Sequence, residues 1–131
     1  MADRITTNTN LVALEILTDY DVGQLTTSRL GHEDPAWSVR HDRAWDRILH
    51  ELGKRRPPIT ESDISDTSVL AYASCYYVAH LACQQGRSDR YQKMADDFYA
   101  KFKRELAEVQ IDITTGTVAR TSFSFIRGLR S

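Results

Sequence analysis

The chain has little of what marks several large classes of protein. Its 131 residues include only two cysteines and three prolines, and its net charge is -1. A charge so close to zero provides no strong field for a nucleic acid or a membrane surface. The longest apolar stretch, residues 69–83, is shorter than the roughly 20 residues that cross a bilayer, so we expect no contact with a membrane. Cys75 and Cys83 lack the paired spacing of a zinc site, and we expect buried free thiols in a reducing compartment.

The sequence also lacks a pattern that would carry catalysis. It has no glycine-rich phosphate loop and no nucleophile elbow, and its four histidines are scattered. His41 and His50 are nine positions apart, which places them on opposite sides of one helix. We therefore predict no catalytic residues, no metal, no cofactor and no enzymatic activity. Residues 1–10 are polar and lack the apolar core of a secretory signal, so the protein is expected to be made and kept in a cytoplasm.

What is present is the composition of one globular domain, with 41% apolar and 27% charged residues. Hydrophobic periodicity predicts a mainly α fold, a small bundle of about four helices over residues 11–109. A flexible polar arm over residues 1–10 precedes it, and an extended or β-hairpin C-terminal arm over residues 110–131 follows it. The first helix is expected to begin near Asp19 with Thr18 as its cap, and to end near residue 30.

The second helix is better marked. Asp34 suits the N-cap and Pro35 the first helical position, where a missing N–H costs nothing. A basic cluster at residues 54–56 favours its C-terminal end. One face is apolar at three- and four-residue steps: Trp37, His41, Ala44, Trp45, Ile48 and Leu52.

The third and fourth helices are predicted to form the core. The third begins at Asp63 or Asp66 and is apolar nearly all round over residues 69–83, which is typical of a central helix. The fourth begins at Ser88 or Asp89 and is charged on one side. Its other side carries an apolar stripe: Tyr91, Met94, Ala95, Phe98, Phe102, Leu106 and Val109.

After Val109 the apolar period changes from about 3.6 to 2. Ile111 and Ile113 alternate with polar residues before a Thr-Gly turn signal, which predicts a hairpin or an extended arm. A single hairpin is marginal in water, so its apolar edge must pack on its own domain or add to a partner's sheet.

Charge changes sign in blocks along the chain. Residues 1–39 are acidic, residues 40–56 are basic, and residues 57–86 hold three acids and neither lysine nor arginine. Beyond Asp112 there are three arginines and no acid. Alternating blocks suit a protein whose one face meets another face of a neighbour. An ordinary solvated surface explains them equally well.

The C-terminal arm combines aromatic residues with arginine, the composition of interface anchors. A terminal strand on the domain's own surface is the alternative, and we favour partner binding. The expected partner-binding residues are Arg120, Phe123, Phe125, Ile126, Arg127, Leu129 and Arg130.

The second helix is basic enough to suggest contact with DNA or with a neighbouring subunit. Arg40, Arg43 and Arg47 are the residues expected to make it. The start of that helix offers few base-reading side chains, so sequence-specific binding is not expected, whereas loose contact of the arginine arm with phosphates stays open. A small helical DNA-binding regulatory protein is therefore the alternative function.

The order of these segments resembles a known family. An early short helix (TDYDVGQL), a Trp- and Arg-bearing helix, an apolar helix (VLAYASCYYVAHLA), an amphipathic helix (YQKMADDFYAKFKREL) and an arm with FIRG follow each other. Over roughly residues 18–131 this pattern is similar to that of the head–tail connector proteins of tailed bacteriophages, also called neck adaptor or head-completion proteins.

The resemblance implies a structural virion protein in the neck, made in the host bacterial cytoplasm. Copies of the chain would form a homo-oligomeric, dodecameric ring between the portal protein and a tail or stopper protein, with the C-terminal arm reaching a neighbour or the portal. The inner wall would line the channel and touch the packaged DNA without sequence preference. Ring closure requires a head-to-tail contact between different faces of one subunit.

Overall fold

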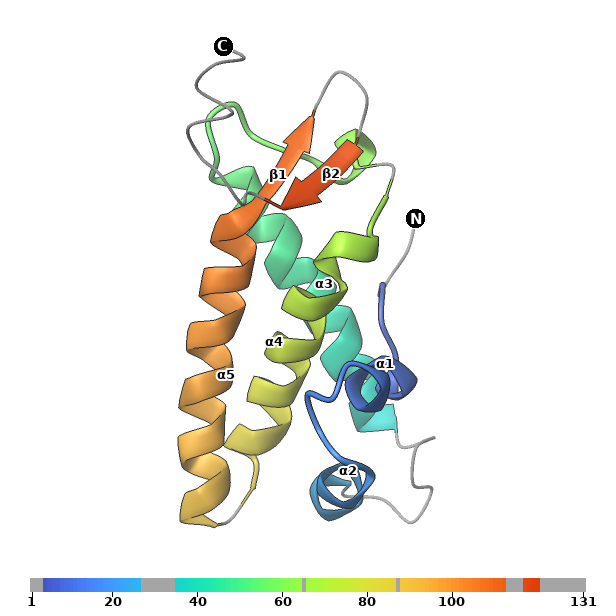
Figure 1. Ribbon diagram of the computed structural model, residues 1–131, viewed down its shortest axis with the longest axis vertical. Coiled ribbons are helices and arrows are strands. Elements are labelled where there is room, and N and C mark those ends of the chain that lie inside the picture. Colours follow the sequence, from blue (N-terminus) through green and yellow to red (C-terminus); the bar gives the residue numbers. More distant parts are fainter. Residues whose placement is uncertain (1–3, 27–34, 65, 87, 113–116, 121–131) are drawn as a thin grey trace.

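The computed structural model describes residues 4–26, 35–64, 66–86, 88–112 and 117–120 (Figure 1). The prediction of a mainly α chain is confirmed, and a bundle of about four helices fits in outline. In chain order the elements are α1 (Asn8–Ala13), α2 (Asp19–Leu25), α3 (Pro35–Gly53), the 3-10 helices η2 (Glu61–Asp63) and η3 (Ser68–Leu70), α4 (Ala71–Gln84), α5 (Asp89–Glu108), β1 (Val109–Asp112) and β2 (Thr117–Arg120).

Helix α4 lies at the centre of the bundle, as its apolar sequence predicts. It packs along α5 on one side and α3 on the other, and α1 contacts it as well (Figure 1). Three small residues of α4 are completely buried, Ala73, Ala79 and Ala82, which allows the neighbouring helices to approach closely. None of the described helices is long and apolar enough to cross a membrane.

Over the described residues, the core consists of two apolar clusters along this central helix. One lies toward α2 and includes Leu11, Val22 and Trp37. The other lies toward the strands and includes Trp45 and Phe102. The predicted apolar faces of α3 and α5 are confirmed, because their members are buried apart from Met94, which is partly buried.

The helix starts follow the sequence signals only in part. The Thr18 hydroxyl accepts a hydrogen bond from the Asp21 amide at 3.1 Å, and the Ser88 hydroxyl caps α5 in the same way at 3.2 Å. The prediction that Asp63 or Asp66 begins the central helix is wrong, because both side chains hold local turns. Asp63 accepts from the Thr60 amide and Asp66 from the Ser68 amide, each at 2.9 Å. Such local bonds compete with helix formation, and α4 begins only at Ala71.

Helix α2 also ends earlier than predicted, at Leu25 instead of near residue 30. The Thr26 hydroxyl donates a hydrogen bond of 2.6 Å to the Val22 carbonyl and accepts one of 3.0 Å from the Trp37 indole. Thr26 has an extended backbone. Its side chain therefore joins the end of α2 to α3 where the helix stops.

The prediction of a flexible arm over residues 1–10 is wrong for residues 4–10. Arg4 forms an ion pair of 2.7 Å with Asp42 of α3, and Thr6 and Asn8 are buried. Leu11, in α1, is completely buried in the first cluster. The segment is held because its polar side chains find buried partners, which apolar periodicity cannot reveal.

Strands β1 and β2 pair antiparallel, with Val109 opposite Arg120 and Asp112 opposite Thr117. They lie at the end of the bundle where α5 finishes, and β2 contacts η3 (Figure 1). Helix α2 lies at the opposite end (Figure 1). Among the described residues the sheet has these two strands. The predicted turn at residues 115–116 and the arm from residue 121 onward lie outside the described residues.

Candidate functional site

The expected partner-binding residues fall mostly beyond the described part of the chain. Arg120 is the last residue of β2. The other six lie outside the described residues: Phe123, Phe125, Ile126, Arg127, Leu129 and Arg130. The partner-binding role of this arm stays a prediction.

The arginines of α3 are not a single exposed surface. Arg40 is only 4% exposed, its guanidinium carbon lies 4.4 Å from the centre of the Trp37 ring, and it donates a hydrogen bond to Gln85 at the end of α4. The expectation that Arg40 touches DNA or a neighbour is therefore wrong, because this side chain joins α3 to α4. Arg43 is exposed, and Arg47 is partly buried and donates to the Tyr99 hydroxyl at 3.4 Å.

A buried polar cluster joins the N-terminal segment to α3 and α4. His41 Nε2 donates to Asn8 Oδ1 at 2.9 Å, and His41 Nδ1 lies 2.8 Å from the Thr6 hydroxyl. The Thr6 hydroxyl is also 2.7 Å from the Ser74 hydroxyl. A neutral imidazole has one donor and one acceptor, which matches these two partners.

The environment of His41 strongly favours that neutral form. Burial is the main cause, and the nearby positive charge of Arg4 adds to it, so that the pKa of His41 falls from 6.5 to about 4. Asp42 opposes this effect and Arg40 supports it. The cluster holds the N-terminal segment against α3 and α4. Because His41 is only 2% exposed, a substrate has no access to its ring.

The two thiols are buried and free, as predicted. Burial raises the pKa of Cys75 to about 12 and that of Cys83 to about 11. Thiolate is the reactive form, so neither side chain is a nucleophile near neutral pH. Within the described ranges, no three histidine, cysteine, aspartate or glutamate side chains come together as metal ligands would.

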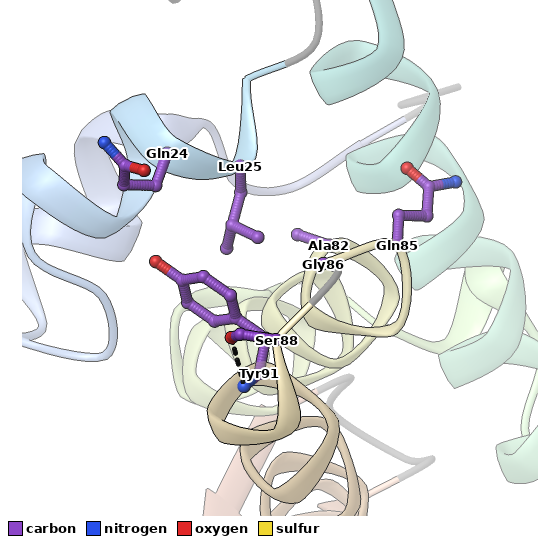
Figure 2. A pocket seen from close by; sticks show the side chains of 7 residues that line it. All are labelled: Gln24, Leu25, Ala82, Gln85, Gly86, Ser88 and Tyr91. Carbon is purple, nitrogen blue, oxygen red and sulfur yellow. Dashed lines mark hydrogen bonds between the residues drawn. The ribbon is translucent and has the colours of Figure 1, made fainter.

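A pocket of about 340 Å³ opens at the end of the bundle that carries α2 (Figure 2). Gln24 and Leu25 of α2 form one wall. The opposite side consists of Ala82, Gln85 and Gly86 at the end of α4, and of Ser88 and Tyr91 at the start of α5. Leu25, Ala82 and the Tyr91 ring provide apolar surface, and the two glutamine side chains provide amide groups.

The two walls of this pocket are joined by a cluster around Asp21. Asp21 Oδ1 accepts from the Tyr91 hydroxyl and from the Arg90 guanidinium, each at 3.2 Å. The carboxylate raises the pKa of Arg90, and burial followed by the carboxylate raises the pKa of Tyr91. Asp21 is thus the link between α2 and α5.

Gly86 is required where α4 turns into α5. A Cβ atom at this position would lie 2.7 Å from Tyr91 Cβ and 2.9 Å from ring atoms of the same residue. The absence of a side chain therefore sets the position of the ring that forms one side of the pocket. The sequence gave no signal for Gly86, Gln24 or Gln85 as pocket residues.

A smaller pocket of about 190 Å³ lies between the ends of α3 and α5. Arg55 lines it and donates to the carbonyls of Leu106 and Val109 at 2.7 and 2.6 Å. These carbonyls belong to the last turn of α5 and its C-cap, which a cation stabilises. The position of Arg55 is accounted for by this structural contact.

The comparison with known proteins gives no match. No family model, no curated protein and no solved structure matches this chain.

Proposed function

We propose that this chain is a structural subunit that assembles through its C-terminal arm into the neck of a tailed bacteriophage. In this role copies form a ring, of dodecameric symmetry, between the portal protein and a tail or stopper protein. The resemblance of the segment order supports the proposal. The chemistry of the described residues fits it, because the buried His41 and Asp21 and the partly buried Arg55 all hold helices together.

One observation carries the proposal: the last described residues, Thr117–Arg120, belong to a two-stranded sheet at one end of the bundle. Val109 and Arg120 face each other across this sheet, so the arm begins level with the end of α5. A sheet of two strands is marginally stable alone and offers its outer edges to further strands. Phe123 and Phe125 alternate with serine three and five residues after Arg120, which fits an arm that binds another chain.

The test is the mass of the assembled protein. We expect the full chain to form rings, alone or on a portal ring, that native mass spectrometry and electron microscopy detect. Replacing Phe123 and Phe125 by serine should leave the bundle folded and remove assembly, because the apolar anchors are lost. The matched control replaces Ser122 and Ser124 by alanine, which changes the same segment but keeps both rings.

Three results would contradict the proposal. One is a full chain that stays monomeric at high concentration with and without portal rings. Another is assembly that survives the Phe123→Ser and Phe125→Ser substitutions unchanged. The third concerns the gene, which should lie between a portal gene and tail genes; a neighbourhood without virion genes would argue against the role.

A further inference from the structure

We propose that the pocket between α2 and the α4–α5 turn is the receiving site for the C-terminal arm of a second copy, with Phe123 or Phe125 inserted beside Leu25 and Tyr91. This inference rests on the proposed function, since it names the surface that accepts the arm. Its occupant is a segment of known sequence, residues 121–131 of a neighbouring chain.

The length of α5 separates the chain's own aromatic residues from this pocket. Tyr91 lines the pocket and Val109 follows the helix, so the 18 residue steps from one to the other span about 27 Å at 1.5 Å per residue. Arg120 lies beside Val109 in the sheet. Phe125 is five residues farther on and reaches at most about 18 Å from Arg120. Because this backbone reach is shorter than the span of α5, a neighbouring molecule brings either aromatic residue to the pocket more readily than the chain's own end does.

The charges around the pocket complement those of the arm. Residues 5–28 contain Glu15, Asp19 and Asp21 and neither lysine nor arginine, and α5 begins with the exposed Asp89. Among the charged residues of α2 and of the first two turns of α5 up to Lys93, the acids Asp19, Asp21 and Asp89 outnumber the bases Arg90 and Lys93. The arm carries arginines at 120, 127 and 130 and no acid. Opposite charge of this kind directs association and fixes its orientation.

The surface of the pocket also suits an aromatic anchor with polar neighbours. Its volume of about 340 Å³ falls within the range of pockets that enclose organic groups. Figure 2 shows the Tyr91 ring and Leu25 facing each other across the opening, with Gln24 and Gln85 farther out at either side. Amide side chains at the rim can bond the backbone of an entering segment, while the apolar floor takes the ring.

The resulting contact is heterologous, because the arm begins after Arg120 at one end of the bundle and the pocket lies at the end that carries α2 (Figure 1). Such head-to-tail contacts close into rings when the rotation between subunits permits it. The pocket thus supplies the second of the two different faces that a ring requires. This contact explains both why residues 1–39 are acidic and why the end of the chain is basic.

A disulfide experiment tests the contact directly. In the full chain, Gln24→Cys places a thiol at the pocket rim and Ser124→Cys places one between the two aromatic residues. Mixing the two single variants under mild oxidation should give a cross-linked dimer on a denaturing gel, and the double variant should give a ladder. Cys75 and Cys83 are buried and will not interfere. Ala100→Cys, exposed near the middle of α5, replaces Gln24→Cys as the matched control and should give no dimer above background.

A charge experiment tests the energetics. The receptor is the full chain with Phe123→Ser and Phe125→Ser, which keeps the pocket but disables its own arm, and the probe is a labelled peptide of residues 117–131. We expect Gln24→Lys to weaken peptide binding about threefold and Gln24→Glu to strengthen it by a similar factor, in line with an exposed charge pair. The same two changes at Ala100 should have no effect.

The outcomes separate this inference from the proposed function. If serine at 123 and 125 abolishes assembly, but Gln24 changes leave binding unaltered and no Gln24–Ser124 cross-link forms, the ring stands and the pocket is the wrong receiver. If the cross-link and the charge effects appear while no ring is ever observed, the docking contact stands and the ring proposal fails. A cross-link formed only within one molecule would overturn the docking contact.

Discussion

Acid should unfold this protein at a higher pH than protonation of its carboxylates alone would cause, because His41 is buried in its neutral form. The imidazole bonds Asn8 and lies against the Thr6 hydroxyl inside the contact between the N-terminal segment and α3. Protonation places a charge in this site close to Arg4 and Arg40, with Asp42 as the opposing charge. The perturbation is simply a fall in pH from 7 to 4.

The magnitude follows from the two pKa values of His41. The folded pKa is about 4 and the ordinary value is 6.5, so between these values the unfolded chain binds more protons. The stabilisation is therefore fully present above pH 6.5 and is lost as the pH falls toward 4. A difference of about 2.5 pKa units corresponds to about 3 kcal/mol, of which about 2 kcal/mol is lost by pH 5.

The assay is urea unfolding followed by the fluorescence of Trp37 and Trp45, both buried in the native state. At pH 5 we expect a loss of about 2 kcal/mol relative to pH 7, or roughly 8 °C in a thermal scan of a domain this size. A His41→Gln variant has no titrating ring, so its stability should change little between pH 6.5 and 5. The matched control is His50→Gln, since His50 is exposed and should leave the pH dependence of the parent intact.

Comparing how stability depends on pH in the parent, His41→Gln and His50→Gln shows whether His41 is the titrating group. If the parent and His41→Gln lose stability in parallel between pH 6.5 and 4.5, His41 is not held neutral by its surroundings. If His50→Gln removes the dependence instead, the titrating group has been misassigned.

Three further substitutions or treatments probe other contacts. Arg55→Met should lower the free energy of unfolding by about 2 kcal/mol in urea melts, because two charged hydrogen bonds to the last turn and C-cap of α5 are lost; a change under 0.5 kcal/mol would show that water replaces them fully. Gly86→Ala should lower the free energy of unfolding by about 2 kcal/mol, because its new Cβ atom would lie too close to Tyr91 of the next helix. Gly53→Ala is the control and should be neutral, since there is open space around Gly53. Equal effects of the two substitutions would contradict the packing argument. Cys75 and Cys83 should react with a thiol reagent at pH 8 only at the rate of unfolding, as measured by mass spectrometry, and rapid labelling of the native protein would show that they are accessible.

Much of the bundle could be predicted from the sequence because apolar periodicity reports directly on burial. The apolar stripes of α3 and α5 are buried as expected, and Pro35 is the first residue of its helix. The packing of the N-terminal segment could not be predicted, because Thr6 and Asn8 are buried through hydrogen bonds. These bonds depend on partners 33 to 68 residues away. No local pattern encodes a partner at that distance.

The candidate site could be predicted even less. Arg40 belongs to a basic run and would be expected to face solvent, but its guanidinium stacks on Trp37 and bonds Gln85. Arginine accepts this position because its planar group packs on an aromatic face while one of its nitrogens donates to Gln85. The pocket itself is formed by residues from three segments, and glutamine or alanine in those segments has no distinctive sequence signature.

The structure of the pocket determines which substitutions separate binding from folding. The Asp21 carboxylate bonds Tyr91 and Arg90, so the walls are fixed by contacts that also hold α2 on the bundle. A pre-formed site loses little conformational freedom when a segment enters it, which favours binding. Changes to Asp21 should consequently weaken folding and docking together, because they release a wall. Changes to Gln24, an exposed residue at the rim, should alter docking alone. A rim substitution that reduced assembly only in proportion to lost stability would mean that the surface contributes nothing of its own.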